Sequence, residues 1–400
     1  MSSPFAPPPN QVTPSAWLRK NLFSSPLNTL LTLVCLVALF AIAQAFWRWN
    51  TLSADWSILP ETLRLLLIGR YPLEETWRLK VVFGLVCLVA GLSWYNPIRE
   101  ELSPRRSFRL RPWLWLALTA GFVVFGWRYF PITTVTLLAT STLFGLGFTL
   151  QRFVLSQFAV FIRWRSLLWL LLYLASLWLI IGGFGLPVIR PDRLSGLLLS
   201  LLVTISAIAL SFPLGVLLAL ARQSELIILR GLAITYIEIV RGVPLISVLF
   251  LAQVMLPLVL PGDVRPDRIL RAVLGFTLFD AAYLAENIRG GLQSINQGQW
   301  DAARAVGLNL PQTLGLIILP QALRVATPAI AGQFISLFKD TSLLSIVGLA
   351  ELLGITQAIL ANPDYRNQVT ELYLCAAVIY SLGCFGIAQL SRRLESSSEH

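Results

Sequence analysis

The chain has 400 residues, of which 56% are hydrophobic and only 13% are charged. Soluble globular domains carry about a quarter charged residues, so the composition excludes an ordinary soluble domain and predicts an integral membrane protein. The net charge of +11 does not predict nucleic-acid binding, because the basic residues stand in short breaks between apolar runs. Basic residues at the flanks of apolar runs are typical of membrane topology and of contact with the lipid bilayer.

Residues 1–26 are rich in Pro and Ser and predict a disordered cytoplasmic tail. Residues 27–188 predict a transmembrane extension, because a membrane helix needs about 20 apolar residues. Its first run is longer than a usual signal core, so we expect it to stay uncleaved. Between the first two runs, residues 50–78 predict an exposed loop with a short interfacial helix at 63–67. The apolar runs of this half are 27–47, 80–95, 112–127, 131–150 and 167–188.

Residues 189–393 predict five more membrane helices and residues 394–400 a short tail. The sequence therefore predicts an all-α membrane protein with about ten helices. An even number places both termini on one side, and the bias of Lys and Arg makes that side cytoplasmic. The apolar runs of this half are 196–220, 233–260, 269–288, 322–349 and 371–390.

The chemistry that this chain can carry is limited by its residue types. The only histidine is His400, and the four cysteines lie apart inside apolar runs. The sequence therefore predicts neither a metal site nor histidine acid–base catalysis. It also lacks a phosphate-binding loop. We expect no cofactor on this chain, and in an ATP-driven system a different chain must bind the ATP.

Residues 293–321 interrupt the second half with a polar stretch that predicts two short helices. Ala302 and Ala303 lack bulk, so another protein can approach the first helix closely. Gly307 is expected to end that helix and Pro311 to begin the second. Pro320, after Leu319, is expected to stop the second helix before the next membrane span.

This stretch resembles the EAA loop of ATP-binding-cassette importer permeases, E-A-A-x3-G-x9-I-x-L-P, with Asp301 where Glu is usual. Asp keeps the charge and with it a capping or salt-bridge role. The resemblance implies that Asp301, Ala302, Ala303 and Gly307, with Leu319 and Pro320, couple the chain to an ATPase subunit.

Residues from about 183 to 393 also resemble the polar amino acid permeases of this superfamily. The resemblance implies a type I importer core in the last five helices and a place in the bacterial inner membrane. It implies as partners an ATPase dimer, a second permease, expected to be a paralogue, and an extracytoplasmic binding protein. Upstream, the chain is similar to the enlarged permeases of general L-amino acid systems. The matching stretches are 236–245, 282–291, 298–300, 319–322 and 339–343.

Charged residues inside apolar runs need partners or a water-filled path. Glu238 with Arg241, and Glu286 with Arg289, stand three residues apart, so each pair shares a helical face and is expected to neutralise itself. Two interpretations stay open: a polar translocation path or gate, and ion pairs that only fix helix packing.

Asp280 has no opposite charge within reach on its own segment. We expect a partner on another helix, contact with water, or protonation. It is a candidate for the substrate path, with helix packing as the alternative. Lys339 and Asp340 are adjacent and cannot face each other on a helix, which predicts separate partners or a local break beside a cavity.

Two other functions compete with the importer. An ion-driven transporter would show inverted repeats and discontinuous helices, and a membrane enzyme would need carboxylates such as Glu238 and Asp280 to act together. No convincing repeat and no acid–base motif stands in the sequence, and the loop at 301–320 has no role in either.

Overall fold

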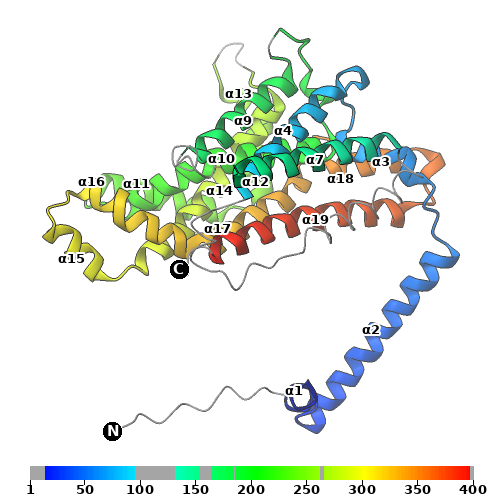
Figure 1. Cartoon of the computed structure of the whole chain (residues 1–400), viewed down its shortest axis with the longest axis horizontal. Helices are drawn as coiled ribbons and strands as arrows, with labels where there is room; N and C mark the ends of the chain where they lie inside the picture. Colours follow the sequence, from blue (N-terminus) through cyan, green and yellow to red (C-terminus); the bar gives the residue numbers. More distant parts are fainter. Residues whose placement is uncertain (1–13, 95–130, 154–163, 184, 262–264, 397–400) are drawn as a thin grey trace. The chain divides into compact units, whose positions relative to one another are not determined.

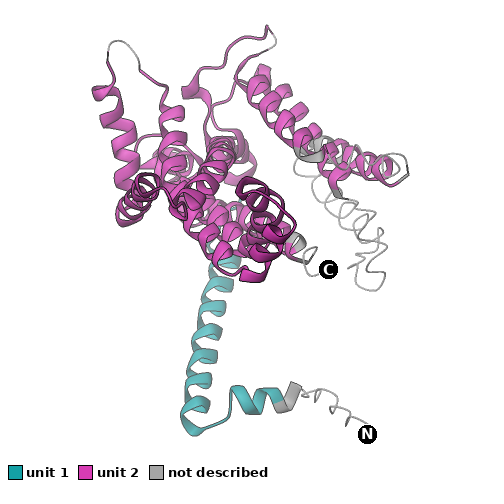
Figure 2. Ribbon diagram, turned by 90° about the vertical axis from the view of Figure 1, so that its left-hand side faces the viewer, with its two compact units in different colours: residues 1–56 teal, residues 57–400 magenta. Residues whose placement is uncertain are grey.

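The computed structural model of the chain describes residues 14–94, 131–153, 164–183, 185–261 and 265–396. Throughout these ranges the chain is helical with short connections, and the one β-bridge recorded there pairs Gly196 with Glu351. Contacts divide the chain into two compact units, residues 1–56 and 57–400 (Figure 2). The predicted all-α class is confirmed, while the predicted helix at 112–127 lies outside the described residues.

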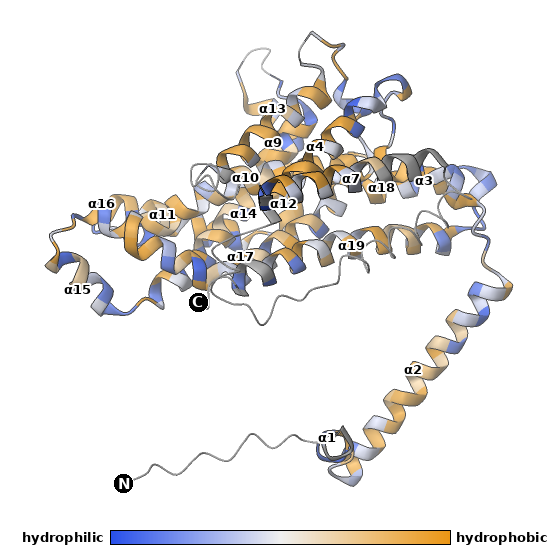
Figure 3. Cartoon of the chain, viewed as in Figure 1, coloured by the Kyte–Doolittle hydropathy of each residue, from blue (hydrophilic) through white to orange (hydrophobic). Residues whose placement is uncertain are grey.

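The first unit contains α1 (Pro14–Asn21) and α2 (Pro26–Leu52). Ser25 caps α2 by accepting a hydrogen bond from the backbone N–H of Asn28, and Pro26 occupies the first turn, where a missing N–H costs nothing. No side chain of α2 is buried, although the helix is apolar along most of its length (Figure 3). Such a helix needs lipid or another protein around it.

The second unit begins with helices that precede the predicted core. These are α3 (Ile58–Ile68), η1 (Leu73–Glu75), α4 (Thr76–Trp94), α7 (Pro131–Phe153) and α9 (Arg165–Ile181). The short helix expected near 63–67 exists, but its surroundings were predicted wrongly. Ile58 and Leu66 are buried, because α3 packs against α10 (Gly196–Arg222) and α18 (Leu352–Leu360).

The helix expected over 167–188 ends earlier, at Ile181. Gly182 takes a left-handed φ of 123°, which favours glycine and stops the helix. The chain then turns back, and the N–H of Ile189 donates to the carbonyl of Ile181.

The core is a bundle in which α10 lies beside α14 (Arg268–Gln293), α14 beside α17 (Leu319–Asp340), and α17 beside α19 (Val369–Ser396) (Figure 1). Small residues of α10, among them Ser200 and Ala207, are fully buried, as expected for closely packed membrane helices. Short elements complete the bundle: η6 (Thr341–Ser345) follows α17, and η7 (Pro363–Tyr365) precedes α19.

The continuous helix predicted for 233–260 is broken. α11 (Ile227–Gly242) is followed by α12 (Leu245–Phe250), the π-helical η4 (Leu251–Met255) and α13 (Leu256–Val259), with a bend of 104° at the break. Pro244 explains the break, because the residue before a proline is pushed out of the helical region. Val243 accordingly has extended dihedral angles.

By length and composition, five helices of the described part are able to cross a membrane, and six if the bent pair counts as one span. They include α2, α10 and α19. Long apolar helices in this number agree with a multi-pass membrane protein.

Candidate functional site

The polar segment between α14 and α17 forms α15 (Gln297–Ala305), α16 (Leu310–Gln312) and the π-helical η5 (Thr313–Ile318), at the end of the bundle opposite α3 and α18 (Figure 1). Gly307 has a φ of +80°, and its N–H donates to Arg304 O at 3.0 Å. The prediction that Gly307 ends the first helix is confirmed.

The start of the second helix also follows the prediction. Asn309 and Gln312 form a reciprocal capping box, with Pro311 in the first turn. The predicted stop at Pro320 is wrong, because η5 continues directly into α17. Pro320 is the second residue of α17, and the helix continues through it directly after the π-helical turn of η5. The preceding Leu319 packs, half-buried, against the core.

The two alanines of the segment, Ala302 and Ala303, lie in different surroundings. Ala302 is exposed, whereas Ala303 is 1% exposed and packs within the chain itself. The small side chain of Ala303 thus lets α15 pack closely on its own chain, while the coupling role of both alanines stays a prediction. Trp300 packs against the core, and Gln299 accepts a hydrogen bond from Gln321 of α17 at 3.2 Å.

These contacts hold α15 against α17 and leave its opposite side exposed. Asp301 lies on that exposed side and forms no ion pair within the described residues. The capping role expected of Asp301 belongs to Asn296, whose side chain accepts from the N–H of Gly298 at 2.8 Å. The free carboxylate of Asp301 is thus available to a second protein.

A cluster of five charged side chains joins α10, α11 and α14 near the same end of the bundle. Glu286 is its centre: Arg289 donates to it through two nitrogens, Arg222 donates at 3.3 Å, and Arg241 lies 3.7 Å away. Glu238 pairs with Arg222 at 3.1 Å. We call these five residues the charge cluster.

The predicted pair of Glu286 with Arg289 is confirmed, but the predicted pair of Glu238 with Arg241 is wrong. Both residues of α11 instead reach other helices. The sequence missed Arg222 because it lies 64 residues before Glu286 and helical spacing reveals only neighbours on one helix. The sequence indicates Arg222 only as a basic residue in the last turn of α10.

Asp280 finds its partners on other helices, which was the first of the three expectations. Its carboxylate oxygens accept from Ser211 of α10 and from Gln333 of α17, each at 2.8 Å. The residue is 1% exposed. Asp280 therefore ties three core helices together, as the packing interpretation expects.

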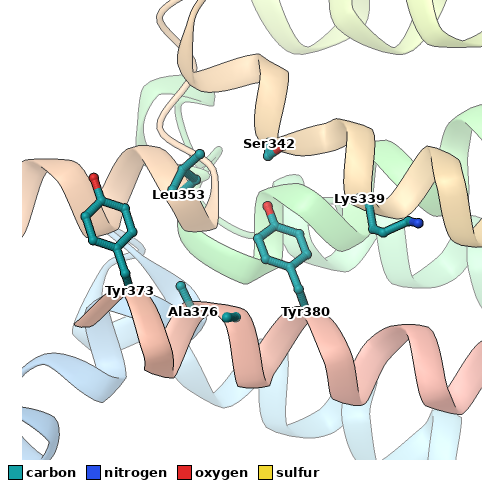
Figure 4. Close-up of a pocket in the computed structure, with 7 residues that line it drawn as sticks. Lys339, Ser342, Leu353, Tyr373, Ala376 and Tyr380 are labelled. Atoms are coloured by element: carbon teal, nitrogen blue, oxygen red, sulfur yellow. The ribbon is translucent and has the colours of Figure 1, made fainter. Parts of the chain in front are cut away.

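The helix is not interrupted at Lys339 and Asp340, because α17 continues directly into the 3-10 helix η6 after Asp340. Lys339 borders an open pocket of about 320 Å³. In Figure 4 the hydroxyl of Tyr380 points toward Ser342, and the pocket lies between η6 and α19. Its lining residues are Lys339, Ser342, Leu353, Tyr373, Ala376, Ala377 and Tyr380.

Glu351 is a fully buried carboxylate that the sequence analysis did not single out. It caps α18 by accepting from the N–H groups of Leu353 and Gly354, each at 2.8 Å, and it accepts from the Tyr380 hydroxyl at 2.6 Å. The sequence indicates this capping role, because Glu351 is an acidic residue directly before an apolar helix.

Comparison with known proteins assigns the chain to a family. Residues 211–399 match the family model described as "Binding-protein-dependent transport system inner membrane component". The glutamate/glutamine/aspartate/asparagine transport system permease protein BztC of Rhodobacter capsulatus is 36% identical over 433 residues, covering 99% of this chain and 96% of that protein. The inner membrane amino-acid ABC transporter permease protein YhdY of Escherichia coli is 32% identical, covering 95% and 91%.

Among solved structures, an amino acid ABC transporter with histidines matches at a TM-score of 0.45 and 28% identity, over 50% of this chain and 92% of that one. The two full-length relatives also cover the helices before the core. The chain thus belongs to the family of inner-membrane permease components of binding-protein-dependent ABC transport systems.

Proposed function

We propose that this permease imports polar L-amino acids, driven by ATP that a partner subunit hydrolyses. The cargo is inferred from the two relatives that align over nearly the whole chain, because both are named as amino-acid permeases. The exposed side of α15, anchored to α17 through Gln299 and Gln321, supports the coupling role. The chain itself needs no cofactor for this task.

Coupling follows from the continuity of the helices. An ATPase that moves α15 moves η5 and α17 as well, because Gln321 of α17 donates a hydrogen bond to Gln299 of α15 and η5 runs into α17 without a break. Asp301 and Ala302 supply the exposed contact, Gly307 sets the turn, and Leu319 and Pro320 open α17. A conformational change in the ATPase is thereby converted into movement of a core helix, which alternating access requires.

The working assembly comprises an ATPase dimer, an extracytoplasmic binding protein and a second permease, which we propose to be a paralogue. The end of the bundle with α15 faces the cytoplasm, and both termini lie on that side. The substrate path runs along the charged core residues. These are Glu238, Arg241, Asp280, Glu286, Arg289, Lys339 and Asp340.

Uptake of radiolabelled L-amino acids into proteoliposomes tests the proposal. The vesicles hold this chain with its co-purified partners and the binding protein, with and without ATP inside. Uptake that requires ATP, and that Asp301→Lys abolishes while the complex stays folded, supports the proposal. Uptake that follows an ion gradient without ATP would overturn it in favour of an ion-driven transporter.

A further inference from the structure

Arg241 differs from the other two arginines of the charge cluster in having a buried guanidinium nitrogen without a hydrogen-bond partner. Arg222 and Arg289 both donate to carboxylates. Arg241 makes no hydrogen bond within the described residues: its Nη1 lies 3.7 Å from Glu286 Oε2, and its Nε is buried without a partner. A buried donor without an acceptor costs about 1–3 kcal/mol, so the position favours a ligand that supplies one.

Both carboxylates of the cluster already accept hydrogen bonds from Arg222 or Arg289. Glu286 receives two hydrogen bonds from Arg289 and one from Arg222, and Glu238 receives the second hydrogen bond of Arg222. Three guanidinium groups face two carboxylates, which leaves one positive charge in excess. The excess belongs to Arg241, because the single ionic contact that it makes among the described residues is the longest in the cluster.

The surroundings of Arg241 fix its orientation and leave it accessible. Its guanidinium carbon lies 5.5 Å from the ring centroid of Tyr283, which itself stacks on Phe279 with a centroid distance of 4.9 Å. An arginine over an aromatic face is held with its planar edge free for a second partner. The side chain is 34% exposed, and a Cβ added to the adjacent Gly242 would meet nothing within 4 Å.

We propose that Arg241 binds the carboxylate group of the transported amino acid near the α15 end of the bundle. The inference rests on the proposed function, since it assigns the substrate group that one residue of the path recognises. A carboxylate fits because its two oxygens match the fork of a guanidinium, and because it neutralises the excess charge of the cluster. Arg222 and Arg289 hold Glu286 and thereby keep it from taking the free donors of Arg241.

Direct binding to the purified importer complex, without the binding protein, tests this assignment. The probe is radiolabelled L-glutamine, and the competitor L-glutaminamide lacks the carboxylate. Arg241→Gln is expected to weaken L-glutamine binding about tenfold to hundredfold, the range of a hydrogen bond to a charged group. Arg241→Lys, which keeps the charge but not the fork, is expected to recover part of the affinity. L-glutaminamide is expected to bind wild type and both variants equally.

Arg230→Gln is the matched control, because Arg230 is an exposed arginine on the same helix that forms no ion pair within the described residues. Arg230→Gln should leave the affinities for L-glutamine and for L-glutaminamide unchanged. An unchanged affinity of Arg241→Gln for L-glutamine, or an equal loss for L-glutaminamide, would overturn the assignment.

A second measurement on the wild-type complex serves if the Arg241 variants do not assemble. Phenylglyoxal modifies accessible arginines, and mass spectrometry follows the adduct on Arg241. L-glutamine should slow its formation and L-glutaminamide should not; equal rates with both would contradict the assignment. Absence of ATP-dependent amino-acid uptake by wild type contradicts the proposed function instead, so the two failures are distinguishable.

Discussion

The carboxylate of Asp280 lies between Ser211 of α10 and Gln333 of α17, with a donor 2.8 Å from each of its two oxygens. At this point α14, which carries Asp280, packs against both α10 and α17. Because the group is buried, its two hydrogen bonds are shielded from competing water.

Asp280→Ala should therefore destabilise the protein by about 2–6 kcal/mol, since two buried donors each lose their acceptor at about 1–3 kcal/mol. Asp280→Asn should cost less, because its amide oxygen still satisfies one donor. Thermal unfolding of the detergent-solubilised protein, followed by size-exclusion chromatography after heating, measures the difference. A thermal midpoint for Asp280→Ala equal to that of wild type would show that these two hydrogen bonds do not stabilise the protein.

Two adjacent glycines at the end of α14 provide a matched pair. A Cβ on Gly291 would lie 2.4 Å from the carbonyl oxygen of Ala322, whereas a Cβ on Gly290 would meet nothing within 4 Å. Gly291→Ala should therefore force α14 and α17 apart and cost about 1–3 kcal/mol, as overpacking does. Gly290→Ala should be neutral or slightly stabilising, because alanine favours the helix. Equal thermal midpoints for the two variants would contradict this account of the contact.

Glu351 gives the core a defined pH dependence. It lies outside the helices that are long and apolar enough to span a membrane, and burial raises the pKa of its carboxyl above the ordinary 4.5. A raised carboxyl pKa contributes stability that is fully present below 4.5 and is lost as the pH rises through the folded-state value.

The thermal midpoint of wild type relative to Glu351→Gln should consequently be highest at acidic pH and should fall as the pH rises toward neutrality. Parallel melting curves at a series of pH values measure this difference. A wild-type advantage that grows with pH would mean that the four donors around Glu351 outweigh its burial.

The sequence predicted the local features of the fold because these depend on neighbouring residues. Gly307 and Pro311 act through their own backbone, so the two short helices of the polar segment follow from composition. The pair of Glu286 with Arg289 is likewise set by helical spacing.

Contacts between segments far apart in the chain do not follow from the sequence pattern. Arg222 with Glu286 and Ser211 with Asp280 depend on which helices pack together, and hydrophobic periodicity does not encode that choice. The break at Pro244 was predictable, because a proline within a long apolar run signals a bend. Pro320 shows the opposite case, since the helix continues through it from η5 into α17.

ATP-driven uptake by Ala302→Trp shows whether an ATPase docks on the exposed side of α15. Ala302 lies on the exposed side of α15, so the bulky ring cannot disturb the core but would hold an ATPase away from the helix. Ala302→Ser, which stays small, is the control. We predict that the tryptophan variant elutes and melts like wild type but loses at least about tenfold in uptake, equivalent to about 1.4 kcal/mol, while the serine variant transports normally. Undiminished ATP-dependent uptake by Ala302→Trp would contradict the claim that this face of α15 receives the ATPase.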